Sequence, residues 1–152
     1  MSSLRELYQE VILDHNKSPR NCKEIANATH HADGHNPLCG DKIKVYLVIE
    51  DNVIKDVSFI GSGCAISTAS ASLMTESLKG KSESEARHIF ERMHTLLTDE
   101  HEPESIAGLG KLAVFAGVRE FPMRVKCATL SWHTLMAALN RKGSEDGPAT
   151  TE

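Results

Sequence analysis

Two neighbouring runs of apolar residues in the middle of the chain constrain its fold most. In residues 43–49 every second residue is apolar: Ile43, Val45, Leu47 and Ile49. That period of two predicts a strand with one buried face. Residues 50–52 (EDN) form a turn sequence, and residues 53–60 read as a second strand with Val57 and Phe59 on one face. The two runs therefore predict an antiparallel hairpin.

Helical patterns surround this hairpin. Four segments have apolar or small residues at helical spacing: 3–15, 64–79, 82–97 and the segment that follows Pro122. A weaker helical pattern covers 103–116, and residues 24–33 could form an edge strand. Because strands and helices do not alternate, we expect an α+β fold: a small antiparallel sheet of about three strands with helices packed on one face.

Composition limits the domain count and the classes of function. The 152 residues suit one domain, expected over residues 1–142, and the polar segment 143–152 is expected to be a disordered tail. With 17 Lys and Arg against 21 Asp and Glu, the net charge of −4 argues against a nucleic-acid partner. No apolar run is long enough to cross a membrane, and charges interrupt residues 1–15. We therefore expect a cytoplasmic protein with reduced thiols.

Three of the four cysteines lie where a thiolate would be favoured. Cys39 is in a Pro/Gly loop before the first strand, Cys64 opens a helix after two glycines, and Cys127 is in the first turns of the last helix. Helix N-termini favour anions and lower the pKa of a thiol. The positive charges of Arg124 and Lys126 would also lower the pKa of Cys127.

A metal ion could bring these thiolates together. Asp41, two residues after Cys39, would be the natural fourth ligand of a tetrahedral zinc site. The spacing equally allows the cysteines to be small buried apolar residues. Cys22 has no partner in sequence and is expected to be a small buried apolar residue without a function. The histidines show no zinc-binding spacing, and we expect His133 to be structural. Three histidines that precede the loop could be alternative ligands, although we expect them to be surface residues: His30, His31 and His35.

Three ordered motifs resemble those of the NifU/IscU-like iron–sulfur cluster assembly family, and most closely its SufU-type branch. The motifs are residues 36–41 (NPLCGD), 59–67 (FIGSGCAIS) and 125–132 (VKCATLSW). The resemblance covers roughly residues 4–140 and implies an α+β fold. It also implies a metal site made of four residues: Cys39, Asp41, Cys64 and Cys127.

Three departures from the scaffold members of the family resemble the SufU-type branch instead. Lys126 stands where scaffolds typically have His, the Pro-rich chaperone-binding stretch is not reproduced before Cys127, and the gap between Cys64 and Cys127 is longer. A protonated Lys amine is a poor metal ligand.

The resemblance implies a zinc-bound sulfurtransferase in which Cys39 accepts persulfide sulfur from a SufS-like cysteine desulfurase. The sulfur would then pass to downstream iron–sulfur assembly proteins. Arg124 is a candidate for docking the partner. Two alternatives stay open: a scaffold that holds Fe²⁺ or a transient [2Fe–2S] cluster on the same ligands, and a zinc-stabilised interaction module without sulfur chemistry.

Overall fold

The computed structural model describes residues 2–37, 40–98 and 122–140, together with 115, 118 and 149–150. The predicted helical segment 103–116 lies outside this part of the chain except for Phe115, which is buried. The elements are α1 (Ser2–Lys17), β1 (His30–Asn36), β2 (Asp41–Glu50), β3 (Val53–Ser62), α2 (Ala65–Leu78), α3 (Glu83–Thr98), α4 (Pro122–Leu139) and β4 (Ala149–Thr150).

The predicted hairpin is formed by β2 and β3, which pair antiparallel with Val45 opposite Phe59. Its turn residues Asp51 and Asn52 have φ angles of 53° and 65°. A two-residue hairpin turn of type I′ needs positive φ at both positions, and Asp and Asn tolerate that conformation better than most residues. The local sequence therefore accounts for both the strands and the turn between them.

The third antiparallel strand, β1, begins six residues later than the predicted edge strand 24–33, and it pairs with β2. Its inward residues are small or polar, so they produce no apolar alternation in the sequence: His30, Ala32, Gly34 and Asn36. A Cβ atom at Gly34 would collide with the side chain of Thr134 in α4. The strand is thus specified by close packing rather than by an apolar pattern.

The sheet has the strand order β3-β2-β1-β4. Its three longer strands are antiparallel, as predicted, and β4 adds two residues parallel to β1. Ala149 and Thr150 of β4 belong to the segment predicted as a disordered tail, and pairing through main-chain groups needs no apolar face. The rest of that segment lies outside the described residues, so the domain boundary at residue 142 stays a prediction.

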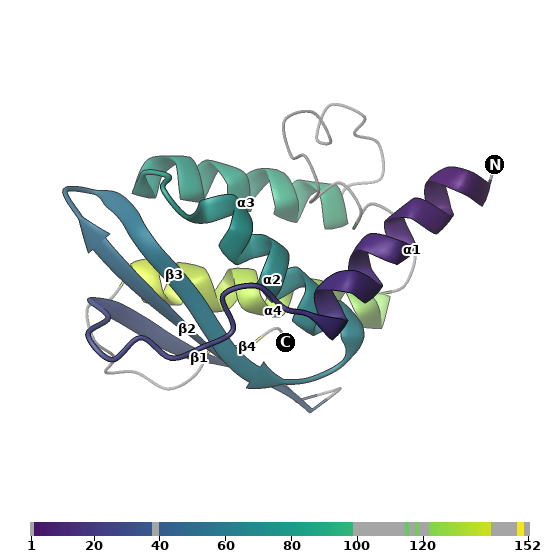
Figure 1. Ribbon diagram of the computed structural model, residues 1–152, viewed down its shortest axis with the longest axis horizontal. Coiled ribbons are helices and arrows are strands. Elements are labelled where there is room, and N and C mark those ends of the chain that lie inside the picture. The colour runs from purple at the N-terminus through teal and green to yellow at the C-terminus, as the bar shows by residue number, and fades with distance from the viewer. Residues whose placement is uncertain are drawn as a thin grey trace.

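The helices gather on one side of the sheet, as Figure 1 shows, and the predicted α+β fold is confirmed. The helix α4 packs on β1 and β2, α2 packs on β3, and α1 and α3 pack on these two helices. The core between the layers includes fully buried Val45, Val57, Leu73 and Trp132. Within the described residues no helix combines the length and apolar character that crossing a bilayer requires.

Small residues let α2 approach α4 closely, and a hydrogen-bonded serine joins the two helices. The Oγ of Ser70 donates to the carbonyl of Ala128 at 2.6 Å and accepts from Nε1 of Trp132 at 3.1 Å. Trp132 is 1% exposed, as expected of a core residue. Because Cys64 precedes α2 and Cys127 lies in α4, this contact controls how near the two cysteines come.

Candidate metal centre

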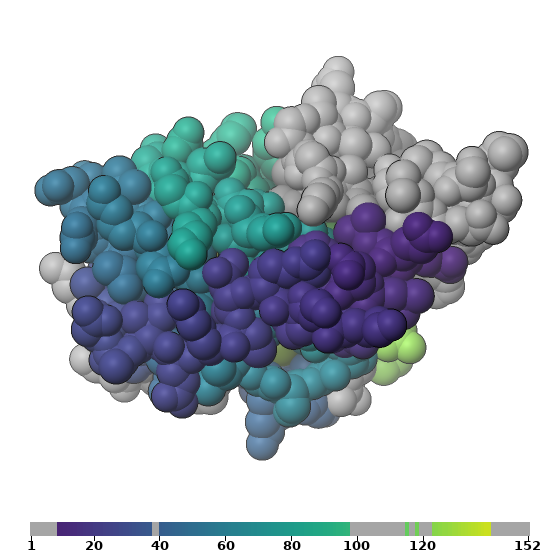
Figure 2. Space-filling view, in the orientation of Figure 1, coloured from purple at the N-terminus to yellow at the C-terminus, as the bar shows by residue number. Residues whose placement is uncertain are grey.

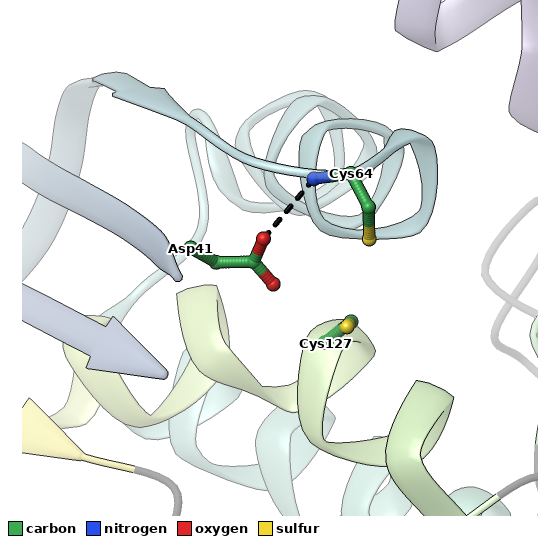
Figure 3. A group of neighbouring side chains, drawn as sticks. All are labelled: Asp41, Cys64 and Cys127. Atoms are coloured by element: carbon green, nitrogen blue, oxygen red, sulfur yellow. Dashed lines mark hydrogen bonds between the residues drawn. The ribbon is translucent and has the colours of Figure 1, made fainter. Parts of the chain in front are cut away.

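Three of the four predicted ligands meet at one point of the structure. A carboxylate oxygen of Asp41 and the sulfurs of Cys64 and Cys127 all lie within 4.8 Å of one another. Asp41 begins β2, Cys64 immediately precedes α2, and Cys127 lies in α4, so three separate elements supply them. In Figure 3 the carboxylate points toward the two sulfurs.

Cys64 is the N-cap residue of α2. Residues 61–63 (GSG) end the strand, and Cys64 has an extended backbone with φ −75° and ψ 172°. Its Sγ accepts a hydrogen bond from the backbone N–H of Ser67 at 3.4 Å. A sulfur at this position lies at the positive end of the helix dipole, where negative charge is stabilised.

Asp41 is 1% exposed, and its two carboxylate oxygens differ. Oδ1 accepts from the backbone N–H of Cys64 at 3.1 Å, whereas Oδ2 is buried with no hydrogen-bond partner among the described residues. A Cβ atom at position 63 would lie 2.6 Å from Oδ1, so only glycine leaves room for the carboxylate. An orphaned buried oxygen is costly, and a cation would offset that cost. The two sulfurs and this oxygen therefore fit a zinc ion.

Cys127 is fully buried, and it lies in the second turn of α4 rather than at the helix terminus. The helix dipole therefore acts less strongly on Cys127 than on Cys64, because its effect falls off within the first turn. Asn36, which is also fully buried, donates from Nδ2 to the Sγ of Cys127 at 3.9 Å. No sequence pattern assigns Asn36 a role. Strand alternation from Ala32 could have placed it on the inward face, had β1 been predicted at its true position.

Cys39 lies outside the described residues, so its place in the site stays a prediction. The residues that flank its loop are described: Asn36 and Asp41 face each other at the ends of β1 and β2. Arg124 is exposed and Lys126 is half-buried at the start of α4. Neither forms an ion pair with a described residue, and their roles also stay predictions.

Cys22 does not join the cluster. The expectation that Cys22 is buried is wrong: it is exposed and lies beside Phe59, in a segment after α1 that runs along β3 and is joined to it through main-chain groups. The backbone N–H of Phe59 donates to the carbonyl of Asn21 at 3.0 Å, and Ser58 donates to the carbonyl of Lys23 at 2.7 Å. Figure 2 shows the end of α1 and this segment, in purple to indigo, lying across one face of the molecule.

No described histidine joins the cluster of Asp41, Cys64 and Cys127. The expectation of surface histidines is wrong for His30, which alternation turns inward, where its Nδ1 hydrogen-bonds to Thr29 at 2.8 Å. His133 packs against the rings of Phe90 and His94, with centroids 5.7 and 6.1 Å away. Burial, and secondarily the nearby His94, lower the pKa of His133 below 6.5. These contacts agree with the predicted structural role.

Comparison with known proteins adds to this geometry. The family model described as "NifU-like N terminal domain" matches residues 7–128, which is most of the chain. This chain belongs to the NifU-like N-terminal domain family. The resemblance drawn from the three sequence motifs is thereby confirmed, and two of the motifs supply the cysteines that meet in the structure.

Relatives within the NifU-like family carry two kinds of name. The chain is 40% identical over 134 residues to the zinc-dependent sulfurtransferase SufU of Bacillus subtilis (strain 168). This match covers 88% of this chain and 90% of the relative. It is 35% identical over 144 residues to the iron–sulfur cluster assembly scaffold protein IscU of Streptococcus pyogenes serotype M1, covering 95% and 89%.

Solved structures share the fold. A putative iron–sulfur cluster assembly scaffold protein for the SUF system, from Fervidobacterium islandicum AW-1, superposes with a TM-score of 0.80 at 36% identity. The match covers 89% of this chain and 98% of that one. Two of these three names describe a scaffold protein of iron–sulfur cluster assembly, and the third describes a zinc-dependent sulfurtransferase.

Proposed function

We propose that this protein is a zinc-bound sulfurtransferase of iron–sulfur cluster assembly that accepts sulfur from a SufS-like cysteine desulfurase. One observation carries the proposal: Asp41, Cys64 and Cys127 bring their ligand atoms within 4.8 Å of one another, and Oδ2 of Asp41 is buried without a hydrogen bond from any residue that the structure describes. The relative in Bacillus subtilis is named a zinc-dependent sulfurtransferase. Such chemistry needs reduced thiols, which suits the cytoplasm.

Zinc would be held by the sulfurs of Cys39, Cys64 and Cys127 and by the carboxylate of Asp41. When bound, zinc keeps cysteine ligands deprotonated at neutral pH without any redox chemistry. The donor set of sulfur and oxygen is one that zinc accepts, and carboxylate is a weaker ligand for it than thiolate.

Cys39 is the thiol proposed to accept sulfur. Covalent geometry limits two residues of chain to about 7 Å, so a cysteine at position 39 is tethered near Asp41. The two other cluster cysteines are poorly placed to attack a partner. Cys127 is fully buried, and Cys64 is held as the N-cap of α2.

The proposed transfer is a thiolate exchange at a sulfur atom. The desulfurase, with its own pyridoxal phosphate, presents a cysteine persulfide. The thiolate of Cys39 attacks the terminal sulfur, a new sulfur–sulfur bond forms at Cys39, and the old persulfide bond breaks. The desulfurase cysteine leaves as a thiolate, so one sulfur atom moves and no external oxidant or reductant is consumed. Asp41, Cys64 and Cys127 keep their places, and exposed Arg124 is available for docking.

Substitution of Cys39 tests the proposal against a matched control. With purified desulfurase and free cysteine, the Cys39→Ala variant is expected to lose stimulation of sulfide release. Mass spectrometry of the wild-type protein should find the added sulfur on Cys39. The Cys22→Ala variant removes an exposed thiol outside the cluster and should behave as wild type. Full stimulation by Cys39→Ala, or wild-type protein that never carries the extra sulfur, would contradict the role; the latter result fits a zinc-stabilised interaction module.

The second candidate function is a scaffold for a transient [2Fe–2S] cluster, which the names of the IscU relatives favour. Thiolates are the usual ligands of such clusters. Anaerobic reconstitution with iron and sulfide separates the two functions. A coloured cluster that transfers to an apo-ferredoxin supports the scaffold, whereas a colourless protein that retains one zinc supports sulfur transfer.

A further inference from the structure

The side chain of Asn36 is fully buried and its amide nitrogen lies 3.9 Å from the Sγ of Cys127. We propose that Asn36 is a positioning residue that holds Cys127 as a fixed metal ligand and ties it to the loop that contains Cys39. This inference rests on the proposed zinc site. It assigns a role to a residue that does not itself bind the metal.

The three described ligand residues all accept a hydrogen bond from a nitrogen. The backbone N–H of Ser67 donates to the Sγ of Cys64, and the backbone N–H of Cys64 donates to Oδ1 of Asp41. Cys127 receives its hydrogen bond from a side chain, that of Asn36. The first two donors belong to the main chain and survive most substitutions, whereas the third can be removed by changing one residue.

Cys127 has a particular need for a donor. It lies in the second turn of α4, where backbone N–H groups are already used by the helix itself. It is also fully buried, and a buried thiolate without a hydrogen-bond partner is costly. An amide N–H suits a thiolate, since it donates to a charged acceptor without adding a charge of its own.

Asn36 also contacts the loop through its main chain. Its carbonyl accepts from the backbone N–H of Gly40 at 2.8 Å, which closes the turn between β1 and β2. The turn residue Gly40 has a φ of +75°, a conformation that glycine adopts freely. One residue therefore joins the loop that contains Cys39 to the buried ligand Cys127.

The hydrogen bond from Asn36 also affects the reactivity of Cys127. A hydrogen bond to sulfur withdraws electron density from it, so Cys127 is a weaker nucleophile than a thiolate without a donor. Asn36 thus favours Cys127 as a permanent ligand rather than as the thiol that accepts sulfur. Groups around metal ligands that act in this way typically change metal affinity by about 10- to 100-fold when they are removed.

Two substitutions and one control test the role of Asn36. Asn36→Asp keeps the size of the side chain but replaces the donor with an oxygen, and Asn36→Ala removes the whole amide. Ser58→Ala removes the hydrogen bond that another fully buried side chain makes, to the carbonyl of Lys23, well away from the cluster along the sheet. The zinc dissociation constant of each protein is measured by competition with a chromophoric chelator, after circular dichroism has shown that the variant is folded.

Both Asn36 variants are expected to bind zinc about 10- to 100-fold more weakly than wild type, and Ser58→Ala to stay within about twofold. With Co²⁺ as a probe, the sulfur-to-metal charge-transfer band should shift in the Asn36 variants only. If Asn36→Ala does not fold, the size-matched Asn36→Asp decides.

Wild-type zinc affinity and an unchanged Co²⁺ spectrum in a folded Asn36 variant would overturn the inference, as would an equal loss in Ser58→Ala. If the wild-type protein binds no zinc, the proposed function fails together with this inference. If wild type binds zinc and stimulates the desulfurase while Asn36→Asp retains full affinity, only the positioning role fails.

Discussion

Replacing Ser70 with alanine should destabilise the protein far more than removing one hydroxyl group normally does. The serine donates to the carbonyl of Ala128 at 2.6 Å and accepts from the indole N–H of Trp132 at 3.1 Å. In Ser70→Ala the indole N–H stays buried without an acceptor, which costs about 1–3 kcal/mol, and the lost bond to Ala128 adds about 1 kcal/mol. The expected loss in the free energy of unfolding is therefore about 2–4 kcal/mol.

Urea denaturation of the metal-free protein measures this loss, since a bound ligand would add its own stabilisation. Trp132 is the only tryptophan in the chain, so its fluorescence reports on the contact itself. With an m value of about 2 kcal/mol/M, the unfolding midpoint should fall by about 1–2 M. The control is Ser77→Ala in the same helix, whose hydroxyl donates to the carbonyl of Leu73 and orphans no donor when removed. It should cost less than about 0.5 kcal/mol.

A double substitution checks the cause of the loss. Trp132→Phe removes the indole N–H, so adding Ser70→Ala to it should cost less than Ser70→Ala alone, as judged by circular dichroism. Equal costs of Ser70→Ala in the two backgrounds, or a loss no larger than that of Ser77→Ala, would refute the idea that the buried indole N–H depends on Ser70.

Two further predictions concern the cluster and the histidine pair. Gly63→Ala would place a Cβ 2.6 Å from Oδ1 of Asp41, so the carboxylate must move. Zinc should then bind at least about 10-fold more weakly in chelator competition. The control, Ser62→Ala, changes an exposed residue and should bind zinc normally. Because burial, and then His94, lower the pKa of His133 below 6.5, the unfolded state binds the proton more readily. The free energy of unfolding should therefore fall as the pH drops through 6.5 and level off below the folded pKa. The fall should be smaller in His133→Gln. Denaturation at about pH 7.5 and pH 5.5 measures the fall, and an identical pH dependence in both proteins would contradict the prediction.

Local sequence patterns determined most of the secondary structure. The alternation in residues 43–49 and 53–60, the turn at Asp51 and Asn52, and the start of α2 after Cys64 all depend on residues close together in the chain. The capping pair Ser82 and Glu85 likewise forms at the start of α3, with reciprocal hydrogen bonds of 2.9 and 3.1 Å. Such features follow from backbone preferences and hydrophobic period, which the sequence carries directly.

The strand β1 shows where local patterns fail. Its inward positions hold residues such as Ala32, Gly34 and Asn36, so its position is decided by pairing with β2 and by the close approach of α4 at Gly34. The misplaced strand also hid the burial of His30 and the contact between Asn36 and Cys127. Neither could be predicted while the register of β1 was unknown.

The sequence by itself determined which residues could bind a metal, because thiolate and carboxylate chemistry belongs to the side chains and the motifs that contain them are recognisable. Only the tertiary structure decided that Asp41, Cys64 and Cys127 meet within 4.8 Å. Their separation depends on how a strand and two helices pack together, through the link from Ser70 to Trp132 and the space left by Gly63. Distances of that kind arise from contacts between residues remote in the chain, and no local period encodes them.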